Sequence, residues 1–237
     1  MRLHFIQHVP PENPGSILIW AKEKGHTVTH TITYENETFP DLQSFDWLVV
    51  MGGPMNIYEE GDHPWLVDEK EFIKRSIAAG KVVLGFCLGS QLIADVIGGK
   101  VTANAQPEIG WMPIRWSDRA STDPLFSFFP ESPVVFHWHN DTFSILPPEA
   151  EVLAESAACN HQAFVYRERV FGFQFHLENT SEMLQGLIAL SGGEMVPAAY
   201  MQSPEEVMGH PEHISQNNKW LSEFLTRLEE RERRCLL

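Results

Sequence analysis

Cys87 stands where an apolar run ends and a helix-like segment begins, in Val-Val-Leu-Gly-Phe-Cys-Leu-Gly-Ser-Gln (residues 82–91). This pattern predicts a strand, a sharp turn with Cys87 at its apex, and a helix whose N-terminus points at the sulfur. Gly85 and Gly89 allow the backbone to pack closely around such a turn. We expect the thiol to be exposed there. The amide dipoles of the first helical turn would favour its thiolate, which attacks carbonyl carbons.

A second pair of reactive groups lies far downstream, in the apolar segment Val-Phe-Gly-Phe-Gln-Phe-His-Leu-Glu (residues 170–178). Side chains two positions apart share one side of an extended chain, so His176 and Glu178 can meet near one point. A cysteine, a histidine and a glutamate can supply a nucleophile, a base and a group that orients the base. We therefore predict that Cys87, His176 and Glu178 act together as a catalytic triad.

The segment Trp-Leu-Val-Val-Met-Gly-Gly-Pro (residues 47–54) reads as a buried strand that runs into a glycine turn. Free amides in such a turn can bind an anion. We expect Gly53 to provide one amide of an oxyanion hole and Leu88 to provide the other. Because Gly52 and Gly53 impose little steric restriction, the amide of Gly53 is expected to flip at low cost. The two glycines could instead do no more than form the turn.

These segments lie in a chain that alternates strands and helices. Strands are expected at residues 3–7, 27–33, 47–51 and 82–86, and helices at 16–24, 68–79, 183–190 and 204–228. Shorter strands and proline-containing turns between residues 101 and 170 suggest an antiparallel excursion. The pattern predicts an α/β protein with a mostly parallel central sheet, helices on both faces and reactive groups at the carboxyl ends of strands. We expect one domain over residues 1–237, with a helical C-terminal extension from about residue 191.

Five segments, in this order, resemble the class I or triad glutamine amidotransferases, particularly stand-alone proteins similar to the glutaminase domain of GMP synthase. They are Gly-Gly-Pro (52–54), Phe-Cys-Leu-Gly-Ser-Gln (86–91), Glu-Ile-Gly-Trp (108–111), His-Trp-His-Asn-Asp (137–141) and Gln-Phe-His-Leu-Glu (174–178). The resemblance runs from Leu3 to about Leu190 and implies a flavodoxin-like class I glutaminase fold with a small antiparallel excursion. Leu177 stands where many members carry proline, and Ser90 stands where many carry glutamine or histidine. Neither change removes a reacting group.

The resemblance implies a mechanism for these residues. Cys87 would attack the side-chain amide carbon of glutamine, while His176, oriented by its carboxylate partner, would move the proton. Gln91 matches a position that contacts the substrate glutamine. The backbone at Asn140 and Asp141 would meet the α-amino and α-carboxyl groups of the substrate.

The sequence also offers a candidate metal site. His137 and His139 share a strand face with Asp141 and could ligate a metal. We predict that they do not, because no fourth ligand is evident and the resembled family uses no metal there; no cofactor is expected either. Cys159 and Cys235 are interpreted as small core residues rather than reactive thiols.

Composition argues against several classes of protein. The formal net charge of −15 repels phosphate backbones, so nucleic acid is not an expected partner. No apolar stretch reaches the ~18 residues that a membrane helix needs, and the N-terminus shows no signal-peptide pattern. Three scattered cysteines indicate reduced thiols rather than a disulfide framework. We therefore expect a cytoplasmic protein with no membrane partner.

The fate of the acyl group and of the ammonia stays open, because the chain contains no ATP-binding loop. One hypothesis is a glutaminase or amidotransferase subunit that serves a separate synthetase, with low basal activity until the partner completes the oxyanion hole. A second is a γ-glutamyl hydrolase or peptidase that uses the same Cys87 chemistry on a γ-glutamyl compound. A third is a non-catalytic binding protein that kept the fold.

Overall fold

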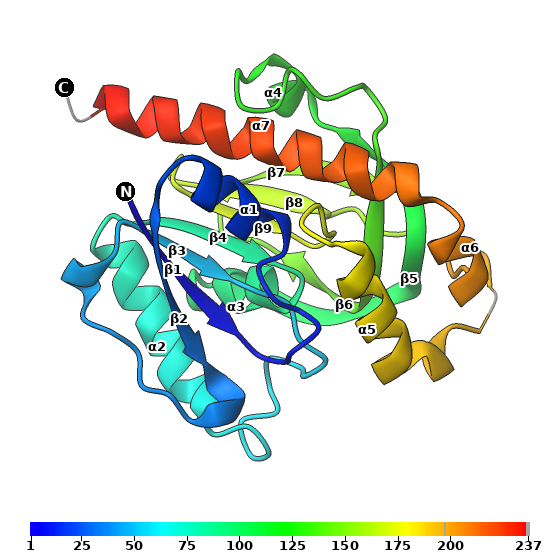
Figure 1. The fold of residues 1–237 in the computed structure, drawn as a ribbon, viewed down its shortest axis with the longest axis horizontal. Coiled ribbons are helices and arrows are strands. Elements are labelled where there is room, and N and C mark those ends of the chain that lie inside the picture. The colour runs from blue at the N-terminus through cyan, green and yellow to red at the C-terminus, as the bar shows by residue number, and fades with distance from the viewer. Residues whose placement is uncertain (197, 236–237) are drawn as a thin grey trace.

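The computed structural model of the chain describes residues 1–196 and 198–235, which fold around one nine-stranded sheet (Figure 1). The strand order is β2-β1-β3-β4-β9-β8-β7-β5-β6. The strands are β1 (Arg2–Gln7), β2 (Thr27–Ile32), β3 (Trp47–Val50), β4 (Val82–Phe86), β5 (Lys100–Trp116), β6 (Val134–Ile145), β7 (Ala150–Ser156), β8 (Ala163–Tyr166) and β9 (Val170–Phe173).

Parallel and antiparallel pairings divide this sheet into two parts. Strands β2, β1, β3, β4 and β9 are parallel to one another. Strands β8, β7, β5 and β6 pair in antiparallel fashion and continue the same sheet beyond β9. The predicted α/β fold with a parallel centre and an antiparallel excursion is confirmed. The excursion is larger than expected, because the long β5 pairs with both β6 and β7.

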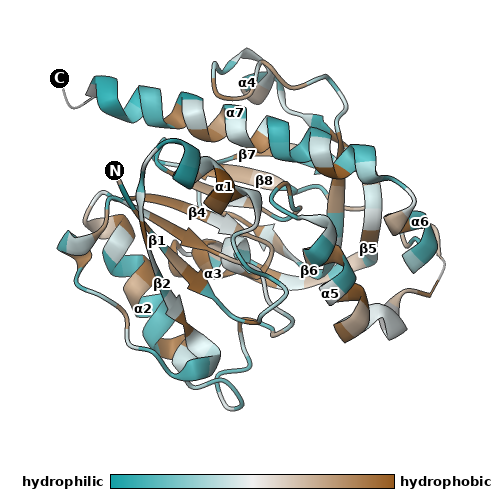
Figure 2. Cartoon of the chain, viewed as in Figure 1, coloured by the Kyte–Doolittle hydropathy of each residue, from teal (hydrophilic) through white to brown (hydrophobic). Residues whose placement is uncertain are grey.

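Helices cover both faces of the parallel part of the sheet. The helices are α1 (Ser16–Glu23), α2 (Trp65–Ala78), α3 (Leu88–Val96), α4 (Asp118–Thr122), α5 (Ser181–Ser191), α6 (Pro204–Met208) and α7 (Pro211–Cys235). Alternate side chains of each strand point to opposite faces, so Val49 packs in the apolar layer of α1 and α7, and Val50 in the layer of α2 and α3. The strands at the centre are mainly hydrophobic, whereas the outer faces of the helices are mainly hydrophilic (Figure 2).

One expected helix is wrong in its extent. The segment predicted as a single helix over residues 204–228 forms α6 and α7, which are separated at Gly209 and His210. A residue that precedes proline is disfavoured in the helical region, so His210 before Pro211 is a natural break. None of the helices in the described part of the chain is both long enough and apolar enough to cross a membrane.

Candidate active site

The predicted strand, turn and helix around Cys87 are present. β4 ends one residue before Cys87 and α3 begins one residue after it. Cys87 has φ 48° and ψ −111°, an unfavourable conformation for a residue with a side chain. Its amide donates to the carbonyl of Phe173 on β9 at 2.8 Å. A Cβ at Gly89 would lie 2.1 Å from the carbonyl oxygen of Val50, so only glycine lets α3 approach β3 this closely.

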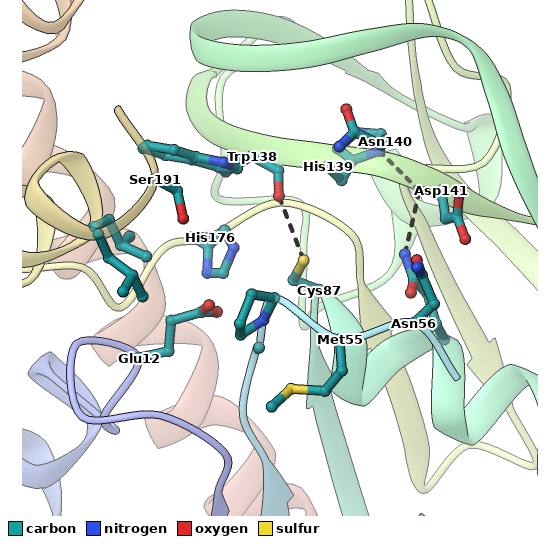
Figure 3. A pocket seen from close by; sticks show the side chains of 15 residues that line it. Glu12, Met55, Asn56, Cys87, Trp138, His139, Asn140, Asp141, His176 and Ser191 are labelled. Atoms are coloured by element: carbon teal, nitrogen blue, oxygen red, sulfur yellow. Dashed lines mark hydrogen bonds between the residues drawn. The ribbon is translucent and has the colours of Figure 1, made fainter. Parts of the chain in front are cut away.

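The thiol of Cys87 is less exposed than the sequence suggested. The residue is only 7% exposed and lies in the wall of a pocket. Burial raises the pKa of the thiol, and hydrogen bonding with His176 opposes that effect only in part. The thiol donates to the carbonyl of Trp138 at 3.5 Å (Figure 3). The expectation of an exposed thiol is wrong, while the amide of Leu88 and His176 both lower the pKa of the thiol, as the helix start predicts.

His176 and Glu178 follow β9 and form a buried pair beside this thiol. His176 Nδ1 lies 2.6 Å from Glu178 Oε1, and the other carboxylate oxygen accepts from the Leu177 amide at 2.9 Å. Burial lowers the pKa of His176, but the charge of Glu178 and hydrogen bonding with Cys87 and Glu178 outweigh it and raise that pKa well above its usual value. Glu178 therefore stabilises the imidazolium form of His176, the form that results when the ring takes up the thiol proton.

The pocket beside the thiol has a volume of about 160 Å³ and gathers most of the residues selected from the sequence (Figure 3). Those that line it are Gly53, Cys87, Gln91, Asn140, Asp141 and His176. Leu88 does not line the pocket with its side chain, but its amide interacts with the Cys87 sulfur. The arrangement can place a small amide substrate against a thiol, an imidazole and two backbone amides.

Gln91, Asn140 and Asp141 form the wall of the pocket that we call the far wall, and hydrogen bonds hold it in place. Gln91 Nε2 donates to the Asp141 carbonyl and to Gln174 Oε1, each at 3.2 Å. The Asp141 side chain accepts from the hydroxyl of Tyr58 at 2.8 Å. Asn140 is exposed at the rim. The amide nitrogen of Gln91 is thus already engaged, so a contact with a ligand would have to use its amide oxygen.

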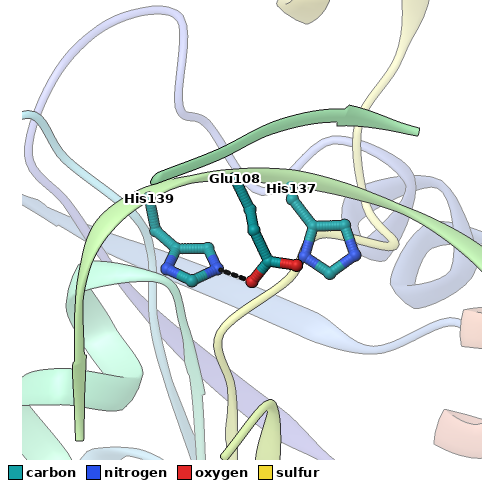
Figure 4. Close-up of side chains that lie close together, drawn as sticks. All are labelled: Glu108, His137 and His139. Atoms are coloured by element: carbon teal, nitrogen blue, oxygen red, sulfur yellow. Dashed lines mark ion pairs between the residues drawn. The ribbon is translucent and has the colours of Figure 1, made fainter. Parts of the chain in front are cut away.

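Behind this wall, the two histidines that the sequence grouped with Asp141 meet Glu108 instead (Figure 4). His139 Nε2 lies 3.1 Å from Glu108 Oε2, and His139 Nδ1 bonds to the Asp141 carbonyl at 3.0 Å. Both oxygens of Glu108 also accept hydrogen bonds from neighbouring side chains. Burial lowers the pKa of His137 to about 4, so this imidazole is neutral near neutral pH. The cluster fixes the backbone of the pocket wall at Asp141.

Two residues of the loop between β1 and α1 were missed by sequence reasoning. Glu12 lines the pocket; a Cβ on Gly52 would lie 1.8 Å from Glu12 Oε2 and 3.2 Å from His176 Cε1. Burial raises the pKa of Glu12. His8 Nδ1 lies 2.9 Å from the Gly52 carbonyl oxygen. The available signal was their position directly after a parallel strand, at the edge of the sheet where such folds bind ligands.

The contact with His8 also corrects the expectation that the Gly53 amide flips freely. The carbonyl of Gly52 belongs to the same peptide group as the amide of Gly53. Because His8 holds that carbonyl, a flip would break a buried hydrogen bond. Two adjacent glycines make the rotation sterically easy, but the surrounding structure opposes it.

Brief treatment with iodoacetamide at neutral pH should label Cys87 before Cys159. Burial raises the pKa of both thiols, but only Cys87 lies on the pocket and has an imidazole to accept its proton. Cys159 is 3% exposed and lies against the Thr142 hydroxyl at 3.1 Å. Mass-spectrometric mapping of the labelled peptides checks the order, and preferential labelling of Cys159 would contradict it. The side chain of Cys235 lies outside the described residues.

Known proteins with similar sequences and folds point to one family. The family described as glutamine amidotransferase class-I matches residues 21–189. The glutamine amidotransferase-like protein YfeJ of Salmonella typhimurium is 36% identical over 235 residues, covering 96% of this chain and 97% of that protein. The GMP synthase [glutamine-hydrolyzing] of Caldicellulosiruptor saccharolyticus is 37% identical over 132 residues, 55% of this chain but 24% of that protein. A glutamine amidotransferase from Thermotoga maritima superposes with a TM-score of 0.86 at 28% identity, covering 96% of this chain and 97% of that one.

Proposed function

The chain belongs to the class I glutamine amidotransferase family, and from that premise we propose that it hydrolyses the side-chain amide of glutamine through a thioester on Cys87. His176 acts as the base, Glu178 orients it, and the amides of Leu88 and Gly53 bind the oxyanion. The observation that most directly supports this proposal is the buried 2.6 Å contact between His176 and Glu178 beside the Cys87 thiol.

Each step of the reaction uses a group of this chain. The Cys87 proton passes to His176 Nε2, and the sulfur forms a bond to the amide carbon of glutamine as the carbonyl electron pair moves onto oxygen. The negative oxygen accepts hydrogen bonds from the amides of Leu88 and Gly53. His176 then protonates the nitrogen, the C–N bond breaks and ammonia leaves a thioester. Water gives a proton to His176 and attacks the thioester, and collapse of the second oxyanion releases glutamate and restores the thiol.

The far wall of the pocket is proposed to bind the glutamyl part of the substrate. We propose that the Gln91 amide oxygen and the backbone at Asn140 and Asp141 bind the α-amino and α-carboxyl groups of the substrate. The network around Asp141 holds this backbone before any substrate arrives. Such preorganisation lowers the entropy lost on binding.

A separate synthetase is the proposed consumer of the ammonia. The chain matches only 24% of the length of the similar GMP synthase, whose name records a glutamine-hydrolysing enzyme. By analogy, the product of Cys87 chemistry would pass to an acceptor site on another protein.

A second candidate function is hydrolysis of a γ-glutamyl compound with a leaving group larger than ammonia. One observation favours it: Leu190 lines both the pocket and a neighbouring, mainly apolar hollow of about 650 Å³. Pro10, Pro11 and Met183 also line this hollow. An amine leaving group could extend from the Cys87 sulfur across Leu190 into it.

An assay of ammonia and glutamate release distinguishes the two candidates. The purified chain is given glutamine beside a series of γ-glutamyl dipeptides, with Cys87→Ala as the control. Turnover of glutamine supports the glutaminase, whereas much higher kcat/KM on a dipeptide supports the γ-glutamyl hydrolase. Absence of turnover on every substrate, with and without cell extract, would contradict both.

A further inference from the structure

His8 and Glu69 form a fully buried pair that the proposed mechanism does not use. His8 follows the last residue of β1, and Glu69 lies on α2. His8 Nε2 lies 2.9 Å from Glu69 Oε1, and both side chains are 0% exposed. The imidazole stacks on Trp65 with ring centroids 5.4 Å apart. Its other nitrogen, Nδ1, bonds to the carbonyl oxygen of Gly52 at 2.9 Å.

The partners of His8 define its protonation. The Gly52 carbonyl oxygen can only accept a hydrogen bond, so His8 Nδ1 carries a hydrogen and donates it to that oxygen. Burial lowers the pKa of His8, but the charge of Glu69 and the hydrogen bonds with Glu69 and the Gly52 carbonyl together outweigh that effect, and the pKa is raised. In the imidazolium form that this raised pKa favours, His8 donates a charge-assisted hydrogen bond to the Gly52 carbonyl. Such bonds are about twice as strong as neutral ones.

This bond determines the direction of the next amide. In a trans peptide the C=O and N–H bonds point in opposite directions, and no peptide bond of the described chain is cis. The Gly52 carbonyl points at buried His8, so the Gly53 N–H points away from His8. Gly53 lines the pocket, and no acceptor within the described residues is bonded to its N–H.

We infer that His8 and Glu69 position and polarise the peptide that supplies the Gly53 amide to the oxyanion hole, an inference that rests on the proposed function above. His8 fixes the orientation of this peptide. Its positive charge also draws electron density toward the Gly52 oxygen, which makes the Gly53 N–H a stronger donor. The Gly53 half of the oxyanion hole is thus formed in the free chain, and no partner is needed to rotate the Gly52–Gly53 peptide. His8 acts through the peptide and is a positioning residue.

Two variants separate orientation from polarisation. In Glu69→Gln the new amide can donate to the lone pair of a neutral His8, which keeps its Nδ1–H on the Gly52 carbonyl but loses the positive charge. In His8→Phe combined with Glu69→Met the ring still stacks on Trp65, no unpaired charge is buried, and the donor to Gly52 is gone.

A control variant changes another buried glutamate that lies beside a histidine and Arg233, far from the pocket. His26 Nε2 lies 3.4 Å from Glu229 Oε1, and the two side chains are 2% and 7% exposed. His26 directly precedes β2, so it lies at the amino ends of the parallel strands. Cys87 follows β4 and lies at their carboxyl ends. Glu229→Gln should lower thermal stability while leaving kcat and KM as in the wild type.

The decisive readout is a fall in kcat without a matching rise in KM. We expect kcat to fall about 100-fold in the double variant and about 5-fold in Glu69→Gln, since loss of a whole hole donor costs about 10²- to 10³-fold. KM should stay within about twofold in both, because the hole binds the transition state. Alkylation of Cys87 by iodoacetamide should keep its rate. Wild-type kcat in a folded double variant would overturn the inference; if that variant does not fold, unchanged kcat in Glu69→Gln would do so.

A spectroscopic test does not depend on turnover, so it separates this inference from the proposed function. Labelling with [15N]glycine gives one amide resonance for each of 16 glycines, and Gly53→Ala identifies the Gly53 signal by its loss. The signal should shift in Glu69→Gln and stay in place in Glu229→Gln. An unmoved signal in Glu69→Gln would overturn the inference even in an active enzyme. A shifted signal in a chain without turnover would support it and contradict only the proposed substrates.

Discussion

Cys87→Ala should abolish the release of ammonia and glutamate while the protein stays folded. The proposed reaction passes through a bond from sulfur to the substrate carbon, and an alanine methyl group cannot form it. Loss of the nucleophile from a catalytic triad lowers kcat by about 10⁶-fold, which would place the variant at the background of a coupled glutamate assay. Circular dichroism and thermal unfolding check that the fold is kept.

The matched control is Cys159→Ala. Cys159 is also buried, at 3% exposure, but it lies outside the pocket against Thr142 and the carbonyl of His161. This variant should lose some stability and keep its kcat. Residual turnover by Cys87→Ala at more than one hundredth of the wild-type rate would show that another group performs the chemistry.

The local parts of the candidate site could be predicted because short sequence patterns determine them. The apolar run before Cys87, with Gly89 following, defines a strand, a turn and a helix start within ten residues. His176 and Glu178 are two positions apart, and the period of an extended chain predicts that they lie on one side. The structure ends β9 at Phe173 and bends the chain beyond it, yet the two side chains still meet. The alternation of strands and helices likewise determined the parallel centre of the sheet.

The parts that the sequence did not reveal depend on contacts between distant segments. His8, Glu12, Glu69 and Glu108 have side chains that are usually solvated, and no local pattern indicates that folding buries them. His8 meets Glu69 only because the end of β1 lies beside the first turns of α2. The burial of the Cys87 thiol has the same origin, since its cover includes Trp138 on β6.

The Glu178 carboxylate is held in a way that makes an amide replacement informative. Its Oε2 accepts from the Leu177 amide, and its Oε1 accepts from His176 Nδ1. In Glu178→Gln the backbone N–H of Leu177 would select the remaining oxygen. The new NH₂ group would then face Nδ1 and donate to it, which forces the proton of the neutral imidazole onto Nε2. A histidine with that tautomer cannot accept the Cys87 proton.

Glu178→Gln should therefore lower kcat by about 10³- to 10⁴-fold, the size of effect that the wrong imidazole tautomer has in triad enzymes. KM should change little, because Glu178 is buried behind His176 and does not line the pocket. Loss of the carboxylate should also lower the pKa of His176, since the charge of Glu178 helps to raise it. Steady-state kinetics measure both constants, with exposed Glu182→Gln as the matched control. A wrong tautomer should leave about a thousandth of the wild-type kcat or less. If Glu178→Gln kept more than about a tenth of it, another carboxylate would have to orient His176.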